Sequence, residues 1–150
     1  MRTTICAAAV LALAASAAHA QPDFRQSAMD AEKALPFSQS VRVGEVVYLS
    51  GQIGNWPGTL ELVPGGMAAE TRQAMENIRM ALAARGLGFE DVFKCTVMLA
   101  DMGKWGEFNE VYRTYFKPGR YPARSSFGAS GLAMGAQVEL ECWASAKAER

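Results

Sequence analysis

Two charged side chains near the end of the chain have the types and spacing of a small-molecule site. Arg124 lies in Tyr121-Pro-Ala-Arg-Ser-Ser-Phe127, and Glu139 follows in Val138-Glu-Leu-Glu-Cys142. An arginine fork binds a carboxylate through two parallel hydrogen bonds, and a glutamate can orient a water molecule or carry a proton. The pair therefore predicts a site that holds a small carboxylate and moves a proton.

Residues 1–20 have the pattern of a secretory signal. Arg2 is their one charge, residues 5–15 are an apolar run, and Ala18-His19-Ala20 has the small-x-small form of a cleavage site. We predict cleavage after Ala20 and a periplasmic or secreted protein that begins at Gln21. A membrane anchor is the alternative, but the apolar run is shorter than a full span.

This cleavage has a chemical consequence, because His19 is the single histidine of the chain. A Ser-His-Asp or Cys-His nucleophile and a histidine-based zinc site are then excluded, and two remaining cysteines cannot form a four-cysteine zinc site. We therefore expect no metal site. Removing Arg2 takes the 15 basic side chains to 14 against 15 acidic ones, a net charge of −1. That balance does not indicate a nucleic-acid or membrane partner.

The two remaining cysteines lie in strand-like runs. Alternation places Cys95 on one face with Val97 and Leu99, and Cys142 with Leu140 and Ala144. An oxidising compartment would allow a disulfide. Because both faces are apolar, we expect buried free thiols instead.

The elements that position Arg124 and Glu139 follow from periodicity. The pattern predicts a polar arm over 21–35 and one domain over 36–150. Within the domain, two helices with apolar stripes alternate with strands. The expected elements are a hairpin over 41–49 turning at Gly44-Glu45, a loop over 54–66 with a possible strand at 59–62, a helix from Thr71 to a stop at Gly86, a strand over 91–100, a helix capped by Asp101 that ends before Pro118, and strands over 123–129 and 137–146.

This order predicts an α+β fold, a two-layer sandwich of one sheet with two helices on one face. Phe93, Met98, Phe127 and Trp143 cannot all reach the helices, because side chains alternate along a strand. An apolar second face of the sheet indicates self-association.

Six motifs, in register over residues 36–147, resemble the Rid (YjgF-type) family of reactive-intermediate deaminases. They are Ser50-Gly-Gln-Ile53, Gly65-Gly66 with Thr71-Arg-Gln-Ala-Met-Glu-Asn77, Asp91-Val-Phe-Lys94, Asn109-Glu-Val-Tyr112, Pro122-Ala-Arg-Ser125 and Val138-Glu-Leu-Glu141. The resemblance implies a chorismate-mutase-like homotrimer with a mixed sheet, whose inner faces form a barrel and whose sites lie between subunits. It also implies hydrolysis of 2-imino and 2-enamino acids to 2-oxo acids and ammonia, without a cofactor.

The same resemblance implies roles for individual residues. Arg124 would bind the substrate carboxylate, and Glu139 would position the water that adds to the imine carbon. Asn109, Ser50 and Phe37 match positions near the cleft. Backbone groups around Ser126 would bind the imine nitrogen or the water.

This chain departs from the family pattern beside the site. It has Leu35-Pro36-Phe37 where Gly-Pro-Tyr is common, so a tyrosine hydroxyl is missing, and it has Ser126 where some members have cysteine. One alternative function is a non-catalytic binder of small carboxylates in the same cleft. Another is a ribonuclease or translation inhibitor, which the net charge and the lack of a mature histidine disfavour.

Overall fold

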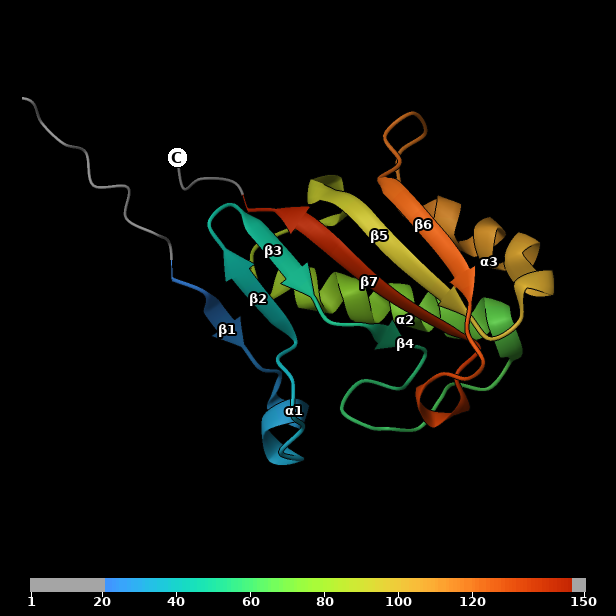
Figure 1. Ribbon diagram of the computed structural model, residues 1–150, viewed down its shortest axis with the longest axis horizontal. Helices are drawn as coiled ribbons and strands as arrows, with labels where there is room; N and C mark the ends of the chain where they lie inside the picture. Colours follow the sequence, from blue (N-terminus) through green and yellow to red (C-terminus); the bar gives the residue numbers. More distant parts are fainter. Residues whose placement is uncertain (1–20, 147–150) are drawn as a thin grey trace, which may run out of the picture.

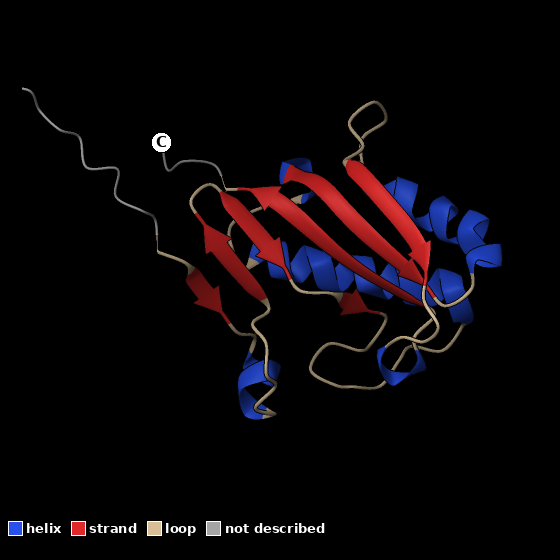
Figure 2. Cartoon of the chain, viewed as in Figure 1, coloured by secondary structure: helices blue, strands red, loops and turns tan. Residues whose placement is uncertain are grey.

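In the computed structural model, which describes residues 21–146, two helices lie against one face of a twisted sheet (Figures 1 and 2). The predicted signal, residues 1–20, lies outside the described residues. The strands are β1 (Asp23–Arg25), β2 (Ser40–Val43), β3 (Val46–Leu49), β4 (Gln52–Ile53), β5 (Val92–Leu99), β6 (Ala123–Gly128) and β7 (Val138–Ser145). The helices are α1 (Ala28–Glu32), α2 (Gly66–Ala83) and α3 (Trp105–Tyr112). Short 3₁₀ turns occupy Phe89–Asp91, Met102–Lys104, Arg113–Tyr115 and Ala133–Gly135.

The sheet is mixed, with the strand order β1-β2-β3-β7-β5-β6 and with β4 also paired to β7. β5 and β6 are parallel and joined by a crossover through α3, whereas the other pairs are antiparallel. This confirms the predicted α+β sandwich. The β2–β3 hairpin is also confirmed, with Val43 opposite Val46 and Gly44 at a φ of +58°.

The core lies between the helices and the sheet. The predicted stripe of α2 is buried, including Met75, Ile78 and Leu82, and alternate residues of β5 and β7 face it. α2 ends as predicted, because Gly86 has a φ of +69° and the Leu87 amide donates to the Leu82 carbonyl at 3.0 Å.

Three local features differ from the sequence-based expectation. α2 begins at Gly66, five residues before Thr71. The possible strand at 59–62 does not form, and the segment contributes one isolated bridge, between Asn55 and Leu62. The second helix is α-helical over Trp105–Tyr112 and continues in 3₁₀ turns at both ends.

The second face of the sheet carries aromatic side chains that no helix covers. Tyr48 and Phe93 are exposed and both pack edge-on against Trp143, with ring centroids 4.9 and 6.5 Å apart. Phe127 is also exposed, and its neighbour Met98 is half-buried. These positions confirm that the strand residues named above do not all reach the helix layer. Within residues 21–146, no helix combines the length and apolarity needed to cross a membrane.

The predicted polar arm over 21–35 contains a strand and a short helix. Its strand β1 pairs with β2, and α1 begins with a capping box between Ser27 and Asp30. Arg85, whose side chain is 7% exposed, forms an ion pair with the Asp23 carboxylate and donates to the Asp23 carbonyl at 3.0 Å and to Ser40 Oγ at 2.9 Å. A buried guanidinium that follows α2 thus holds β1 against the sheet.

The expectation of free thiols was wrong, because Cys95 and Cys142 form a disulfide. The two residues face each other across the antiparallel β5–β7 pair, with Cα atoms 4.1 Å apart, and both are fully buried. Alternation correctly placed each cysteine on the core face. Only the register of the two strands makes them direct partners.

Loss of this disulfide is expected to lower the free energy of unfolding by about 4 kcal/mol, because the bond links residues 47 positions apart. Equilibrium denaturation of the disulfide-bonded protein and of protein that was reduced while unfolded measures the difference in the free energy of unfolding. The double variant Cys95→Ala/Cys142→Ala should show a similar loss without reductant. An unchanged denaturation midpoint in both experiments would contradict the prediction.

Candidate functional site

Arg124 lies on the helix-facing side of β6. In the parallel β5–β6 pair it is opposite Cys95, which belongs to the core. Its guanidinium carbon lies 5.0, 5.5 and 4.7 Å from the ring centroids of Trp105, Phe108 and Tyr112 on α3. No carboxylate within residues 21–146 forms a salt bridge with it. A half-buried guanidinium with aromatic contacts and no acidic partner has hydrogen-bond donors available for an anionic ligand.

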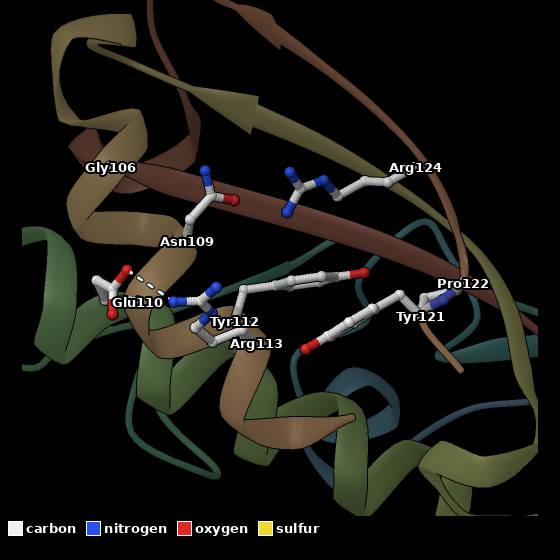
Figure 3. A pocket seen from close by; sticks show the side chains of 8 residues that line it. All are labelled: Gly106, Asn109, Glu110, Tyr112, Arg113, Tyr121, Pro122 and Arg124. Carbon is white, nitrogen blue, oxygen red and sulfur yellow. Dashed lines mark hydrogen bonds and ion pairs between the residues drawn. The ribbon is translucent and has the colours of Figure 1, made fainter. Parts of the chain in front are cut away.

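These donors open on a cleft of about 600 Å³ between α3 and the start of β6 (Figure 3). The residues that line it are Gly106, Asn109, Glu110, Tyr112, Arg113, Tyr121, Pro122 and Arg124. In Figure 3 the Asn109 amide points toward the Arg124 guanidinium from the opposite wall. The structure therefore brings together two of the residues predicted from sequence, and their side chains can contact one small ligand.

Ser126, a third predicted residue, lies two positions along β6 and points to the same side. Its register partner is Val97, another core residue. The hydroxyls of Ser126 and Tyr112 are buried and have no hydrogen-bond partner in the described part of the chain. Burial raises the pKa of Tyr112 to about 12 against the opposing effect of Arg124, so this hydroxyl stays protonated at neutral pH. Because β6 is the edge strand, its outer backbone groups have no partner strand in the described chain.

Glu139 lies on the other face of the sheet. It alternates on β7 with the buried residues Val138 and Leu140, and it is half-buried beside Met98 of β5 and Ile53 of β4. Burial raises the pKa of Glu139, and the charge of Glu141, on the same face, raises it further. A carboxylate with a raised pKa is a better proton acceptor than an ordinary surface glutamate.

Gly51 leaves room for the Glu139 carboxylate. A Cβ on Gly51 would overlap Glu139 Oε1 and lie 2.9 Å from Cδ. Sequence reasoning did not assign this residue to the site, although it is within the Ser50-Gly-Gln-Ile53 motif. Ser50 Oγ donates to the Ser38 carbonyl at 2.6 Å, next in the chain to the exposed ring of Phe37. This hydrogen bond links the segment after β3 to the segment that carries Phe37.

The predicted site residues therefore form two separate groups. The arginine group, with Asn109, Arg124 and Ser126, lies on the helix side of the sheet and at its β6 edge. Glu139, with Gly51 beside its carboxylate, lies on the opposite face, and Ser50 precedes Gly51 in the chain. Phe37 is exposed and precedes Ser38, whose carbonyl accepts the hydrogen bond from Ser50. The structure does not bring Arg124 and Glu139 together within one chain, because the sheet lies between them.

Comparison with known proteins places this geometry in a family. The family model described as Endoribonuclease L-PSP matches residues 26–146. A mouse protein named 2-iminobutanoate/2-iminopropanoate deaminase is 45% identical over 106 residues, which are 71% of this chain and 78% of the mouse protein.

Two solved structures share the fold and part of the sequence. A Yersinia pestis protein described as a member of the conserved Rid family is 34% identical, with a TM-score of 0.71, over 74% of this chain and 88% of its own. E. coli TdcF with bound serine is 33% identical, with a TM-score of 0.68, over 73% of this chain and 87% of its own. The fold, the six motifs and these matches together show that the chain belongs to the Endoribonuclease L-PSP family, which is also called the YjgF or Rid family.

Proposed function

We propose that the protein hydrolyses 2-imino and 2-enamino acids to 2-oxo acids and ammonia. The observation that carries the proposal is Arg124, a half-buried guanidinium that opens on a cleft and has no acidic partner among residues 21–146. Support comes from relatives that are named imine deaminases and are 42–45% identical. The related TdcF structure contains serine, whose carboxylate is the kind of group that Arg124 can bind.

The residues present suffice for this reaction. Arg124 holds the carboxylate and so fixes the neighbouring imine carbon, which is already electrophilic. Water adds its oxygen to that carbon and gives one proton to Glu139. For the protonated imine, Glu139 then returns this proton to the nitrogen of the tetrahedral adduct and the C–N bond breaks. Ammonia leaves, and the hydroxyl of the adduct gives its proton to the Glu139 carboxylate as the carbonyl forms. Orientation of the two reactants and one positioned proton acceptor supply the catalysis.

The separation of the two groups leads to a proposal about assembly. We propose that the Arg124 group of one subunit faces the Glu139 group of a neighbour in a homotrimer. The uncovered aromatic face around Tyr48, Phe93 and Trp143 supports burial between subunits, because monomeric proteins rarely expose such a patch. Light scattering on the purified protein measures the subunit number.

Mixed assemblies test the shared site directly. When Arg124→Ala and Glu139→Gln subunits are unfolded and refolded together, a site between subunits should recover about a quarter of the wild-type rate. A site contained in one subunit should recover none. The two variants refolded separately are the controls.

We also propose that the protein works outside the cytosol. The composition of residues 1–20 and the buried Cys95–Cys142 disulfide both favour an oxidising compartment. The intact mass of the exported protein tests the proposal, and retention of residues 1–20 would contradict it.

A coupled assay on the chain from Gln21 tests the activity. An amino-acid oxidase generates imines, semicarbazide traps them, and a deaminase lowers the semicarbazone signal. Loss of signal that depends on the protein supports the proposal. If the protein binds 2-oxo acids but hydrolyses no imine, it is instead a carboxylate-binding protein.

The contact between Gly51 and Glu139 yields a further prediction. Gly51→Ala should lower kcat by about 10²-fold, because the new methyl group displaces the carboxylate and a small misplacement of a catalytic group has a large effect. Stability should change little, since the group displaced is the end of a flexible side chain. Gly131→Ala is the control, because a Cβ there has nothing within 4 Å. Steady-state kinetics and thermal unfolding of both variants make the comparison.

A further inference from the structure

The face of α3 that lines the Arg124 cleft continues into the 3₁₀ turn that follows it. Gly106, Asn109, Glu110 and Arg113 have the spacing i, i+3, i+4 and i+7, and all four line the cleft. A Cβ on Gly106 would meet nothing within 4 Å, so this part of the cleft is open. Arg113 is therefore a second guanidinium on the wall that carries Asn109, as Figure 3 shows.

The two arginines of the cleft are held very differently. Arg124 is half-buried against three aromatic rings. The Arg113 side chain is 61% exposed and has one ionic partner among residues 21–146, the 73% exposed Glu110, at 3.2 Å. An exposed pair of this kind contributes little, because solvent screens it and both long side chains lose freedom. A ligand carboxylate can therefore replace Glu110 as the partner of Arg113 at small cost.

We propose that the cleft selects substrates with a second carboxylate, namely the 2-imino acids derived from acidic amino acids. Arg124 holds the carboxylate next to the imine carbon, and Arg113 binds the carboxylate at the far end of the side chain. Glu110 competes for Arg113 and repels that distal carboxylate. This inference rests on the proposed deaminase function and adds its substrate class.

The proposal predicts opposite effects from two neighbouring residues. Arg113→Ala should lower kcat/KM for the imine of glutamate or aspartate about tenfold, mainly through KM, because a charge-assisted hydrogen bond is lost. Activity on the imine of alanine should stay within about twofold, because its methyl group does not need Arg113. Glu110→Gln should raise kcat/KM for the dicarboxylic imines and leave the imine of alanine unchanged.

The chain offers a matched control on the other helix. Arg79 of α2 pairs with Glu76 at the same i,i+3 spacing and at 2.9 Å, but it lines no part of the cleft. Arg79→Ala should not alter the ratio of the two activities. If Arg113→Ala lowers both activities equally, or neither, the proposed selectivity is wrong.

Binding separates this inference from the deaminase proposal. Calorimetry with 2-oxoglutarate and 2-oxobutanoate compares the wild type with Arg113→Ala without turnover. Weaker binding of 2-oxoglutarate alone supports the role of Arg113, even if no imine is hydrolysed and the function proposal fails. Hydrolysis of imines together with equal binding of both oxo acids to the two proteins overturns the inference and leaves the function intact.

Discussion

Arg124→Ala is expected to lower kcat/KM for every imine by about 10²-fold or more, because a desolvated partner of the substrate carboxylate is lost. The effect should appear for apolar and acidic side chains alike, since the carboxylate beside the imine is common to all of them. Steady-state kinetics with the semicarbazide assay measures it. Binding of 2-oxobutanoate should weaken in parallel.

The variant Arg124→Lys separates the contribution of the positive charge from that of the planar guanidinium. Lysine keeps the charge but loses the planar fork that pairs with both carboxylate oxygens, and it stacks less well on the rings of Trp105 and Tyr112. We therefore expect the lysine variant to recover a small part of the lost activity. Full recovery would show that charge alone is required and would contradict the fork-to-fork geometry.

Glu139→Gln is expected to lower kcat by about 10²–10⁴-fold, because the amide cannot accept the proton of the attacking water. Binding of 2-oxo acids should be retained, which distinguishes a deaminase from a binding protein. Glu141→Gln is a matched control on the same face of β7, two residues away. A Glu139→Gln variant with the wild-type rate would assign proton transfer to another group.

The pH dependence follows from the raised pKa of Glu139. The ionised carboxylate is the active form, so kcat should rise with pH through a pKa above the usual value for glutamate. Because the charge of Glu141 contributes to the shift, Glu141→Gln should move this acidic limb to lower pH. The pH profiles of the wild type and of Glu141→Gln test both statements.

The same pKa shift has a consequence for stability. A raised pKa in the folded state means that burial disfavours the charged form, so the wild type loses stability as pH rises through that pKa. Glu139→Gln should therefore be at least as stable as the wild type at neutral pH. The difference should vanish at acidic pH, where Glu139 is protonated. Denaturation at both pH values detects the change.

Much of the fold follows from local periodicity. The apolar stripe of α2, the alternation of β5 and β7 and the Gly44 turn are patterns within a few residues, and each has one structural solution that buries the apolar side chains. The aromatic second face was predictable for the same reason. The β1 strand was not, because Asp23–Arg25 is too short for a period and depends on Arg85, 62 positions away.

The pairing register of the strands could not be predicted from the sequence and is known only from the tertiary structure. Alternation assigns the side chains of each strand to two faces. It does not show which face of one strand lies on the same side of the sheet as a given face of the next strand, because this depends on register. The β5–β7 register joins Cys95 to Cys142. The registers of β6 and β7 on β5 place Arg124 on the core side and Glu139 on the open side. The sequence alone thus proposed Arg124 and Glu139 as reactive residues. The tertiary structure places them on two faces of one sheet, because the pairing of distant strands is a long-range choice that no local pattern encodes.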